Sequence, residues 1–128
     1  MNFNNEKFRP LLPIILLTVW LSSCVAKVEA VFEITNSTNQ TIQRLTIQPD
    51  ANKNNHINIK PNSKLTLKTD MTKLPKIDGS YYLKYTYNDT AREMNFGYYS
   101  NGYPEESITK INIQPDTIII QPQYKKNY

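Results

Sequence analysis

Apolar and polar residues alternate along much of the chain beyond residue 27. In the first such stretch, Ala30, Phe32 and Ile34 share one parity, whereas Glu29 and Glu33 take the other. A period of two is typical of a β-strand with one buried face. Similar short stretches, separated by clusters of Asn, Asp, Pro and Ser, predict further strands over 41–48, 56–60, 64–69, 80–88, 92–100, 107–114 and 117–121. Residues 70–79 show no such period and are expected to form an irregular connection.

The strongest hairpin signal lies in the middle of the chain, where two alternating stretches flank a polar turn over 88–91. Continuous alternation through both stretches predicts that five aromatic side chains fill the core: Tyr81, Tyr85, Tyr87, Phe96 and Tyr98. The same parity places Tyr82, Tyr99 and Tyr103 on the opposite face or in the turn that contains Asn101. Either neighbouring strands cover these three tyrosines or they are free to contact a ligand.

These strands and turns predict the fold class. Turns that recur every 8–12 residues, with no convincing helical period, favour an all-β Ig-like or transthyretin-like sandwich of about seven to eight short antiparallel strands. We expect this domain to span residues 28–122 and to be followed by a polar tail over 123–128. A chain of 128 residues suits one such domain.

Residues 1–23 have the features of a secretory signal peptide. Lys7 and Arg9 precede an apolar run over 11–21, which is shorter than the 20 or so residues of a membrane-spanning helix. The run ends in Leu21-Ser22-Ser23-Cys24, which resembles the lipobox of bacterial lipoproteins. The resemblance implies cleavage between Ser23 and Cys24, a diacylglycerol on the Cys24 sulfur, and an acyl chain on its amino group.

The same resemblance implies a location in the cell envelope. Residues 24–27 would form the lipidated N-terminus and a short tether, with the bilayer as a partner through Cys24. In lipoproteins of Gram-negative bacteria, Asp after the cysteine favours retention in the inner membrane. Val25 follows here, so the outer membrane is expected if the source is Gram-negative. Because the tether is so short, we expect the N-terminal end of the sandwich to face the lipid. A partner site would then lie at the free end, with the turn after residue 35 and the Tyr99–Tyr103 loop.

Candidate catalytic and metal-binding residues are few. His56 is the one histidine and has no acidic or thiol neighbour in the sequence. The acidic pairs Glu105–Glu106 and Asp89/Glu93 fall at predicted hairpin ends, where solvated turns are the default. Asp50, Asn52 and Asn54 imitate the start of a calcium loop, but its later glycine and glutamate are missing. We therefore expect no enzyme, no metal site and no cofactor beyond the lipid on Cys24.

The remaining partner classes follow from charge and aromatic residues. The formal net charge is +4, but Lys and Arg are scattered among acids, which argues against nucleic acid. Exposed tyrosines can anchor a protein or stack on a sugar. The sequence thus predicts a non-catalytic binding or accessory module, with a protein partner in the envelope or a glycan at Tyr82, Tyr99, Asn101 and Tyr103. The alternatives are a structural subunit of an envelope or secretion machine, and an inhibitor or immunity protein against an envelope-targeting enzyme.

Overall fold

A computed structural model describes residues 24–126. The predicted signal peptide, including Leu21, Ser22 and Ser23, and the last two residues of the predicted tail lie outside this range. The described chain forms nine strands, which are β1 (Glu29–Asn36), β2 (Ile42–Gln48), β3 (Ile57–Ile59), β4 (Ser63–Asp70), β5 (Gly79–Tyr87), β6 (Thr90–Ser100), β7 (Tyr103–Pro104), β8 (Ile108–Ile113) and β9 (Ile118–Gln123).

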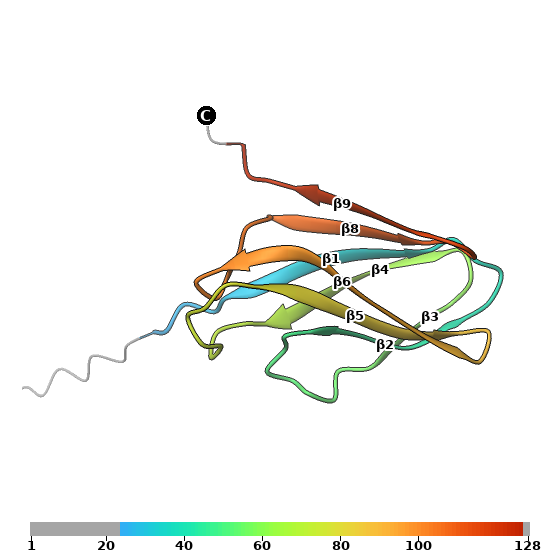
Figure 1. The fold of residues 1–128 in the computed structure, drawn as a ribbon, viewed down its shortest axis with the longest axis horizontal. Helices are drawn as coiled ribbons and strands as arrows, with labels where there is room; N and C mark the ends of the chain where they lie inside the picture. The colour runs from blue at the N-terminus through green and yellow to red at the C-terminus, as the bar shows by residue number, and fades with distance from the viewer. Residues whose placement is uncertain (1–23, 127–128) are drawn as a thin grey trace, which may run out of the picture.

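The strands form two sheets that pack as a sandwich (Figure 1). One sheet has the order β4-β1-β8-β9 and the other has the order β3-β2-β5-β6-β7. The predicted all-β sandwich is therefore confirmed. Two details of the prediction are wrong: β7 adds a two-residue strand, and β1 pairs with β8 in parallel. A parallel pair requires a long crossover connection, and here the chain between β1 and β8 contains β4 of the first sheet and all strands of the second sheet.

The core lies between the sheets and follows the predicted alternation. Ala30, Phe32 and Ile34 of β1 are buried and face the second sheet, where Leu83 and the predicted tyrosines of β5 are also buried. The Phe32 ring meets the ring of Tyr81 edge-on, with centroids 5.0 Å apart. Of the five aromatic residues predicted for the core, four are buried: Tyr81, Tyr85, Tyr87 and Phe96.

Tyr98 is the exception, because a β-bulge interrupts the alternation of β6. Between the pairs Tyr81–Phe96 and Gly79–Tyr99, β6 contains one residue more than β5. Gly97 sits in this bulge with a φ of 59°, a left-handed conformation that glycine adopts without steric cost. Beyond the bulge the two faces exchange. Tyr98 is 47% exposed, whereas Tyr99 packs against the core, so the predicted placement of these two tyrosines is wrong.

The sandwich has two ends that carry different loops. We call the end with residues 24–28, 71–78, 101–107 and 124–126 the Cys24 end. Hydrogen bonds from the Met71 N–H to the Val28 carbonyl and from the Gly102 N–H to the Ile77 carbonyl join its loops. The far end carries residues 37–41, 60–62, 88–89 and 114–117. The turn after residue 35 lies at the far end as predicted, but the Tyr99–Tyr103 loop lies at the Cys24 end because β6 returns from the turn at 88–89.

Candidate functional site

The N-terminal segment becomes part of the fold within a few residues of Cys24. Cys24 is exposed. The Val28 N–H donates to Thr72 Oγ1 at 3.0 Å, and the Met71 N–H donates to the Val28 carbonyl at 2.8 Å. Only residues 25–27 therefore separate Cys24 from Val28, the first residue that is hydrogen-bonded to the sandwich.

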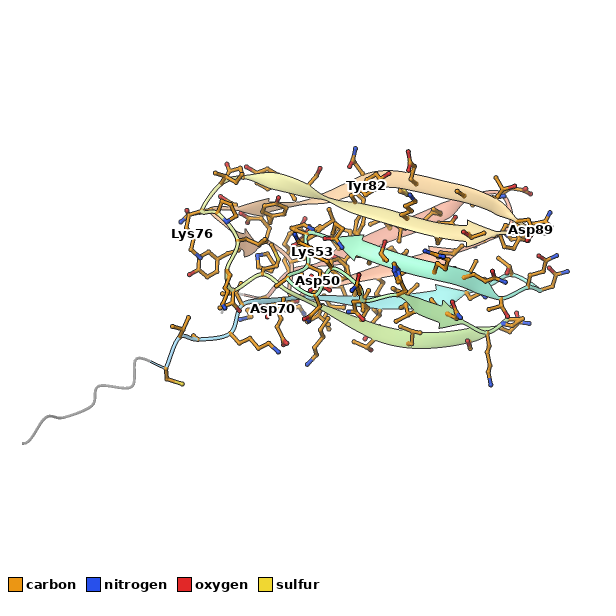
Figure 2. All side chains as sticks on the ribbon, turned by 90° about the horizontal axis from the view of Figure 1, so that it is seen from below. Asp50, Lys53, Asp70, Lys76, Tyr82 and Asp89 are labelled. Atoms are coloured by element: carbon orange, nitrogen blue, oxygen red, sulfur yellow. The ribbon has the colours of Figure 1, made fainter. Side chains whose placement is uncertain are left out.

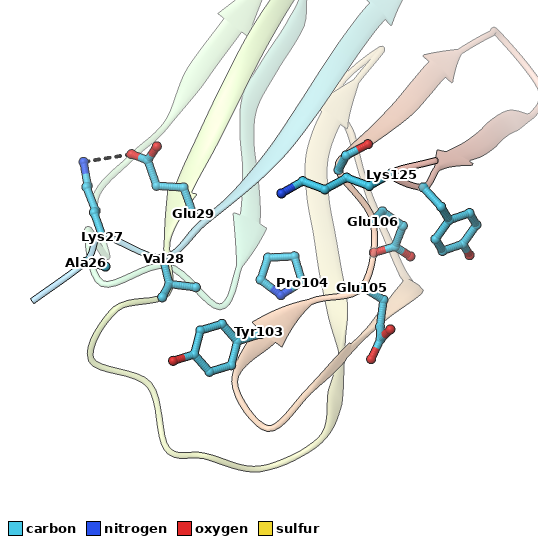
Figure 3. Close-up of a pocket in the computed structure, with 11 residues that line it drawn as sticks. Ala26, Lys27, Val28, Glu29, Tyr103, Pro104, Glu105, Glu106 and Lys125 are labelled. Carbon is cyan, nitrogen blue, oxygen red and sulfur yellow. Dashed lines mark ion pairs between the residues drawn. The ribbon is translucent and has the colours of Figure 1, made fainter. Parts of the chain in front are cut away.

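An open groove of about 600 Å³ lies beside this segment, between residues 26–29 and the chain around β7 (Figure 3). Val28, Tyr103 and Pro104 provide its apolar lining. Lys27 and Lys125 provide positive charge, and Lys27 forms an ion pair of 2.8 Å with Glu29. The groove can therefore accept a ligand or a surface that has both apolar and charged parts.

Glu105 and Glu106 belong to the same groove, but they differ in surroundings. Glu105 is exposed, whereas Glu106 is half-buried, and its Oε2 has no hydrogen-bond partner among the described residues. Burial, with Glu106 as the next contribution, raises the pKa of the Tyr81 hydroxyl well above its ordinary value. The Tyr81 hydroxyl stays protonated and is 3.9 Å from Met71 Sδ.

Asp78 fastens the loop over 71–78 to the turn that follows β6. Its Oδ2 accepts a hydrogen bond of 2.6 Å from the Tyr98 hydroxyl. Its Oδ1 accepts hydrogen bonds from the Asn101 N–H at 2.8 Å and the Ser100 hydroxyl at 3.2 Å. The Tyr98 hydrogen bond is the main cause that lowers the pKa of Asp78, and the same bond raises the pKa of Tyr98. Two loops far apart in sequence are therefore held as one surface.

The four predicted contact residues do not form one site. Asn101 and Tyr103 are both exposed at the Cys24 end. Tyr99 is half-buried against the Tyr81 ring, with centroids 5.5 Å apart, so most of its ring is used in packing. Tyr82 lies on β5, away from the Cys24 end (Figure 2). Its hydroxyl donates to the Glu93 carboxylate, and its backbone pairs with Asn95.

Sequence reasoning did not identify Lys76, Ile77 and Asp78 as surface-forming residues of the Cys24 end. They lie in the irregular segment, where no periodicity predicts which side chain is exposed. Lys76 Nζ lies 4.2 Å from the centroid of the Tyr103 ring. The only sequence signal was the Pro75-Lys76-Ile77-Asp78-Gly79 run itself, which is typical of a turn.

Asp50 and His56, the sequence candidates for metal binding or catalysis, lie in or beside the loop between β2 and β3. Asp50 is buried, and its Oδ1 accepts the N–H groups of Asn52 and Asp70 at 3.0 and 3.1 Å. Its other oxygen accepts a hydrogen bond from the Asn55 amide. Asp50 therefore closes the loop after β2. His56 is exposed next to β3.

Over residues 24–126, no group of three or more His, Cys, Asp or Glu side chains is arranged to hold a metal ion. Within the same range, no helix is long and apolar enough to cross a membrane. Comparisons of the chain with protein-family models, with curated proteins and with solved structures found no match.

Proposed function

We propose that this chain is a lipoprotein of the bacterial cell envelope, held on a bilayer by a diacylglycerol and an acyl chain on Cys24. The observation that carries the proposal is the sequence Leu21-Ser22-Ser23-Cys24, which ends an apolar run and contains the one cysteine of the chain. The exposure of Cys24, four residues before Val28 joins the fold, supports it.

The proposed lipid would hold the protein firmly. Each buried CH₂ group contributes about 0.8 kcal/mol to membrane binding, and a single myristoyl chain binds only marginally. Two or three long acyl chains on one residue would make the anchor effectively permanent. With Val25 after the cysteine, the outer membrane is the proposed location in a Gram-negative cell.

We propose that the anchored sandwich is a non-catalytic binding or accessory module with a protein partner in the envelope. The far end supports this role, because it is the end that a membrane-tethered sandwich turns away from the lipid. Its turns present exposed polar side chains, among them Asn39, Asn62, Asn88 and Asp116. Affinity capture with the detergent-solubilised protein tests the role: one bound enzyme would indicate an inhibitor, a large assembly a structural subunit, and glycan a sugar-binding module.

Metabolic labelling with radioactive palmitate tests the anchor. The wild type is expected to incorporate label and to fractionate with membranes, whereas Cys24→Ala removes the acceptor sulfur and is expected to do neither. Ser23→Ala is the matched control, because Ala still fits the lipobox pattern and the label should be kept. Equal labelling of wild type and Cys24→Ala would contradict the lipoprotein proposal.

A further inference from the structure

Large apolar side chains are exposed mainly at one end of the sandwich. Within residues 24–126, six large hydrophobic side chains are strongly exposed. Four of them belong to the Cys24 end, namely Val25, Ile77, Tyr103 and Tyr124, and a fifth, Tyr98 of β6, is hydrogen-bonded to Asp78 of that end. The sixth, Ile119, lies on the edge strand β9. Such clustering of exposed apolar groups marks an interaction surface rather than ordinary scatter.

The far end has the opposite character. Its turns expose Ser37, Asn39, Gln40, Asn88 and Asp89 and contain none of the six strongly exposed hydrophobic residues. The labelled side chains of Figure 2 show the two ends, with Lys76 near the N-terminal segment and Asp89 at the other extreme. The sandwich therefore exposes large apolar side chains at the end beside Cys24 and polar side chains at the opposite end.

Backbone hydrogen bonds hold Ile77 in place within the loop over 71–78. The Ile77 N–H donates to the Pro75 carbonyl at 2.9 Å, and the Ile77 carbonyl accepts the Gly102 N–H at 3.0 Å. The next residue, Asp78, is bonded to three groups of the β6 turn. Ile77 is nevertheless 60% exposed, so a well-fastened loop presents an apolar side chain to the surroundings.

Lysine and tyrosine side chains surround this loop. Lys76 lies over the face of Tyr103, and Lys73 is exposed three residues earlier in the same loop. Lys125 lines the groove together with Tyr103, and Lys126, the next residue, is also exposed. Tyrosine rings favour the boundary between acyl chains and water, and lysines extend their ammonium groups to lipid phosphates. Isoleucine between tyrosines and lysines is thus the side-chain combination expected for contact with lipid headgroups.

Two acidic groups at or beside this end are already paired with other residues. Asp78 accepts hydrogen bonds through both oxygens, and Glu29 lies 2.8 Å from Lys27 and 3.9 Å from Lys68. Glu105 and Glu106 both line the groove; Glu105 is exposed, and one oxygen of Glu106 has no hydrogen-bond partner among the described residues. Lys73 and Lys76 form no ion pair among the described residues, so their ammonium groups remain available to acidic lipid phosphates.

We propose that the Cys24 end docks onto the bilayer, with Ile77 and Tyr103 inserted at headgroup level and Lys76 beside the phosphates. This inference rests on the proposed anchor at Cys24. Four extended residues span at most about 14 Å, so the anchor keeps this surface within reach of the lipid. A short tether raises the effective concentration of the docking surface at the bilayer, so even a weak contact with lipid is formed most of the time. Docking fixes the orientation of the sandwich and turns its far end outward.

Tryptophan probes test the docking without depending on lipidation in a cell. Trp20 is the only tryptophan, so Trp20→Phe provides a background without one. The full chain is made by cell-free synthesis without lipoprotein-processing enzymes, which leaves the Cys24 thiol free to couple to a maleimide lipid. The vesicles contain phosphatidylcholine and phosphatidylglycerol, with or without bromine on the acyl chains. Ile77→Trp probes the docking loop, Tyr103→Trp is a second probe at the same end, and Asn39→Trp is the far-end control.

Docking predicts that brominated lipid quenches Ile77→Trp and Tyr103→Trp and shifts their emission to the blue, while Asn39→Trp is unaffected. Absence of quenching in all three coupled proteins would overturn the docking, as would equal quenching at both ends. Circular dichroism of each variant checks that it is folded. If Ile77→Trp does not fold, quenching of Tyr103→Trp tests the docking instead. Because the lipid is coupled chemically, the quenching experiment tests the docking alone, whereas palmitate labelling tests the lipidation of Cys24 in the cell.

Discussion

The side-chain amide of Asn36, at the end of β1, donates a hydrogen bond of 2.9 Å to the carbonyl oxygen of Ile59 in β3 and so joins the two sheets. The same amide donates to the carbonyls of Gln40 and Lys60, and its oxygen accepts the N–H and hydroxyl of Thr38. Asn36 is 0% exposed. This one side chain therefore satisfies backbone groups of several segments at the far end.

Asn36→Ala is expected to lower the free energy of unfolding by about 2–4 kcal/mol, because it leaves several buried polar groups without a partner. Asn39→Ala is the matched control in the same turn. Asn39 is exposed, and the control should change stability by less than about 0.5 kcal/mol. Urea unfolding of both variants measures the difference, and equal stabilities would contradict the role assigned to Asn36.

Phe96 and Tyr98 provide a second matched pair, since they are two residues apart on opposite sides of the bulge. The Phe96 ring lies 5.7 Å from Phe32 and 5.5 Å from Tyr81, centroid to centroid. Phe96→Ala should cost about 3–5 kcal/mol of stability. Tyr98→Ala removes an exposed ring and should cost about 1 kcal/mol or less. Thermal melts would contradict the described register if the two losses were similar or reversed.

Much of the fold follows from local alternation, and the exceptions have local causes. The pattern of β1 and β5 predicts their buried residues because neither strand contains an extra residue facing the core. A bulge is a difference between paired strands, so the sequence of β6 alone does not show where Gly97 shifts the parity. Composition likewise does not distinguish Asn36 from Asn39 in one Asn-Ser-Thr-Asn turn. The parallel pairing of β1 with β8, and the exposure of Ile77, depend on segments distant in sequence.

The hydrogen bond between Asp78 and Tyr98 should make the stability of the protein depend on pH, because it shifts the pKa of both groups. The folded-state pKa of Asp78 is below its ordinary value of 3.8, so its contribution is present at higher pH and is lost as pH falls through the folded pKa. The folded-state pKa of Tyr98 is above its ordinary value of 10.0, so its contribution is present at lower pH and is lost as pH rises through the folded pKa. The pair should therefore stabilise the protein most between about pH 4 and pH 10.

Asp78→Asn tests this pH window. The difference in unfolding midpoint between wild type and Asp78→Asn is expected to be largest near neutral pH and to shrink towards both extremes. Asp89→Asn, an equivalent change at the far end, controls for the loss of one negative charge. If the midpoint difference for Asp78→Asn stayed constant from acid to alkaline pH, the hydrogen bond between Asp78 and Tyr98 would not contribute to stability in solution.

Gly97→Ala tests the bulge that separates the buried from the exposed face of β6. Its φ of 59° disfavours a side chain by about 1–2 kcal/mol, and an added Cβ would lie 3.0 Å from Cδ2 of the buried Tyr81 ring. We expect the free energy of unfolding to fall by at least about 1 kcal/mol. Gly97→Asn separates the two causes, because Asn tolerates a positive φ and adopts one at 62, 88 and 101 in this chain. If Gly97→Asn is more stable than Gly97→Ala, backbone strain is the main cause of the loss. If both variants lose the same stability, the contact with Tyr81 is the main cause. No loss in either variant would contradict the bulge.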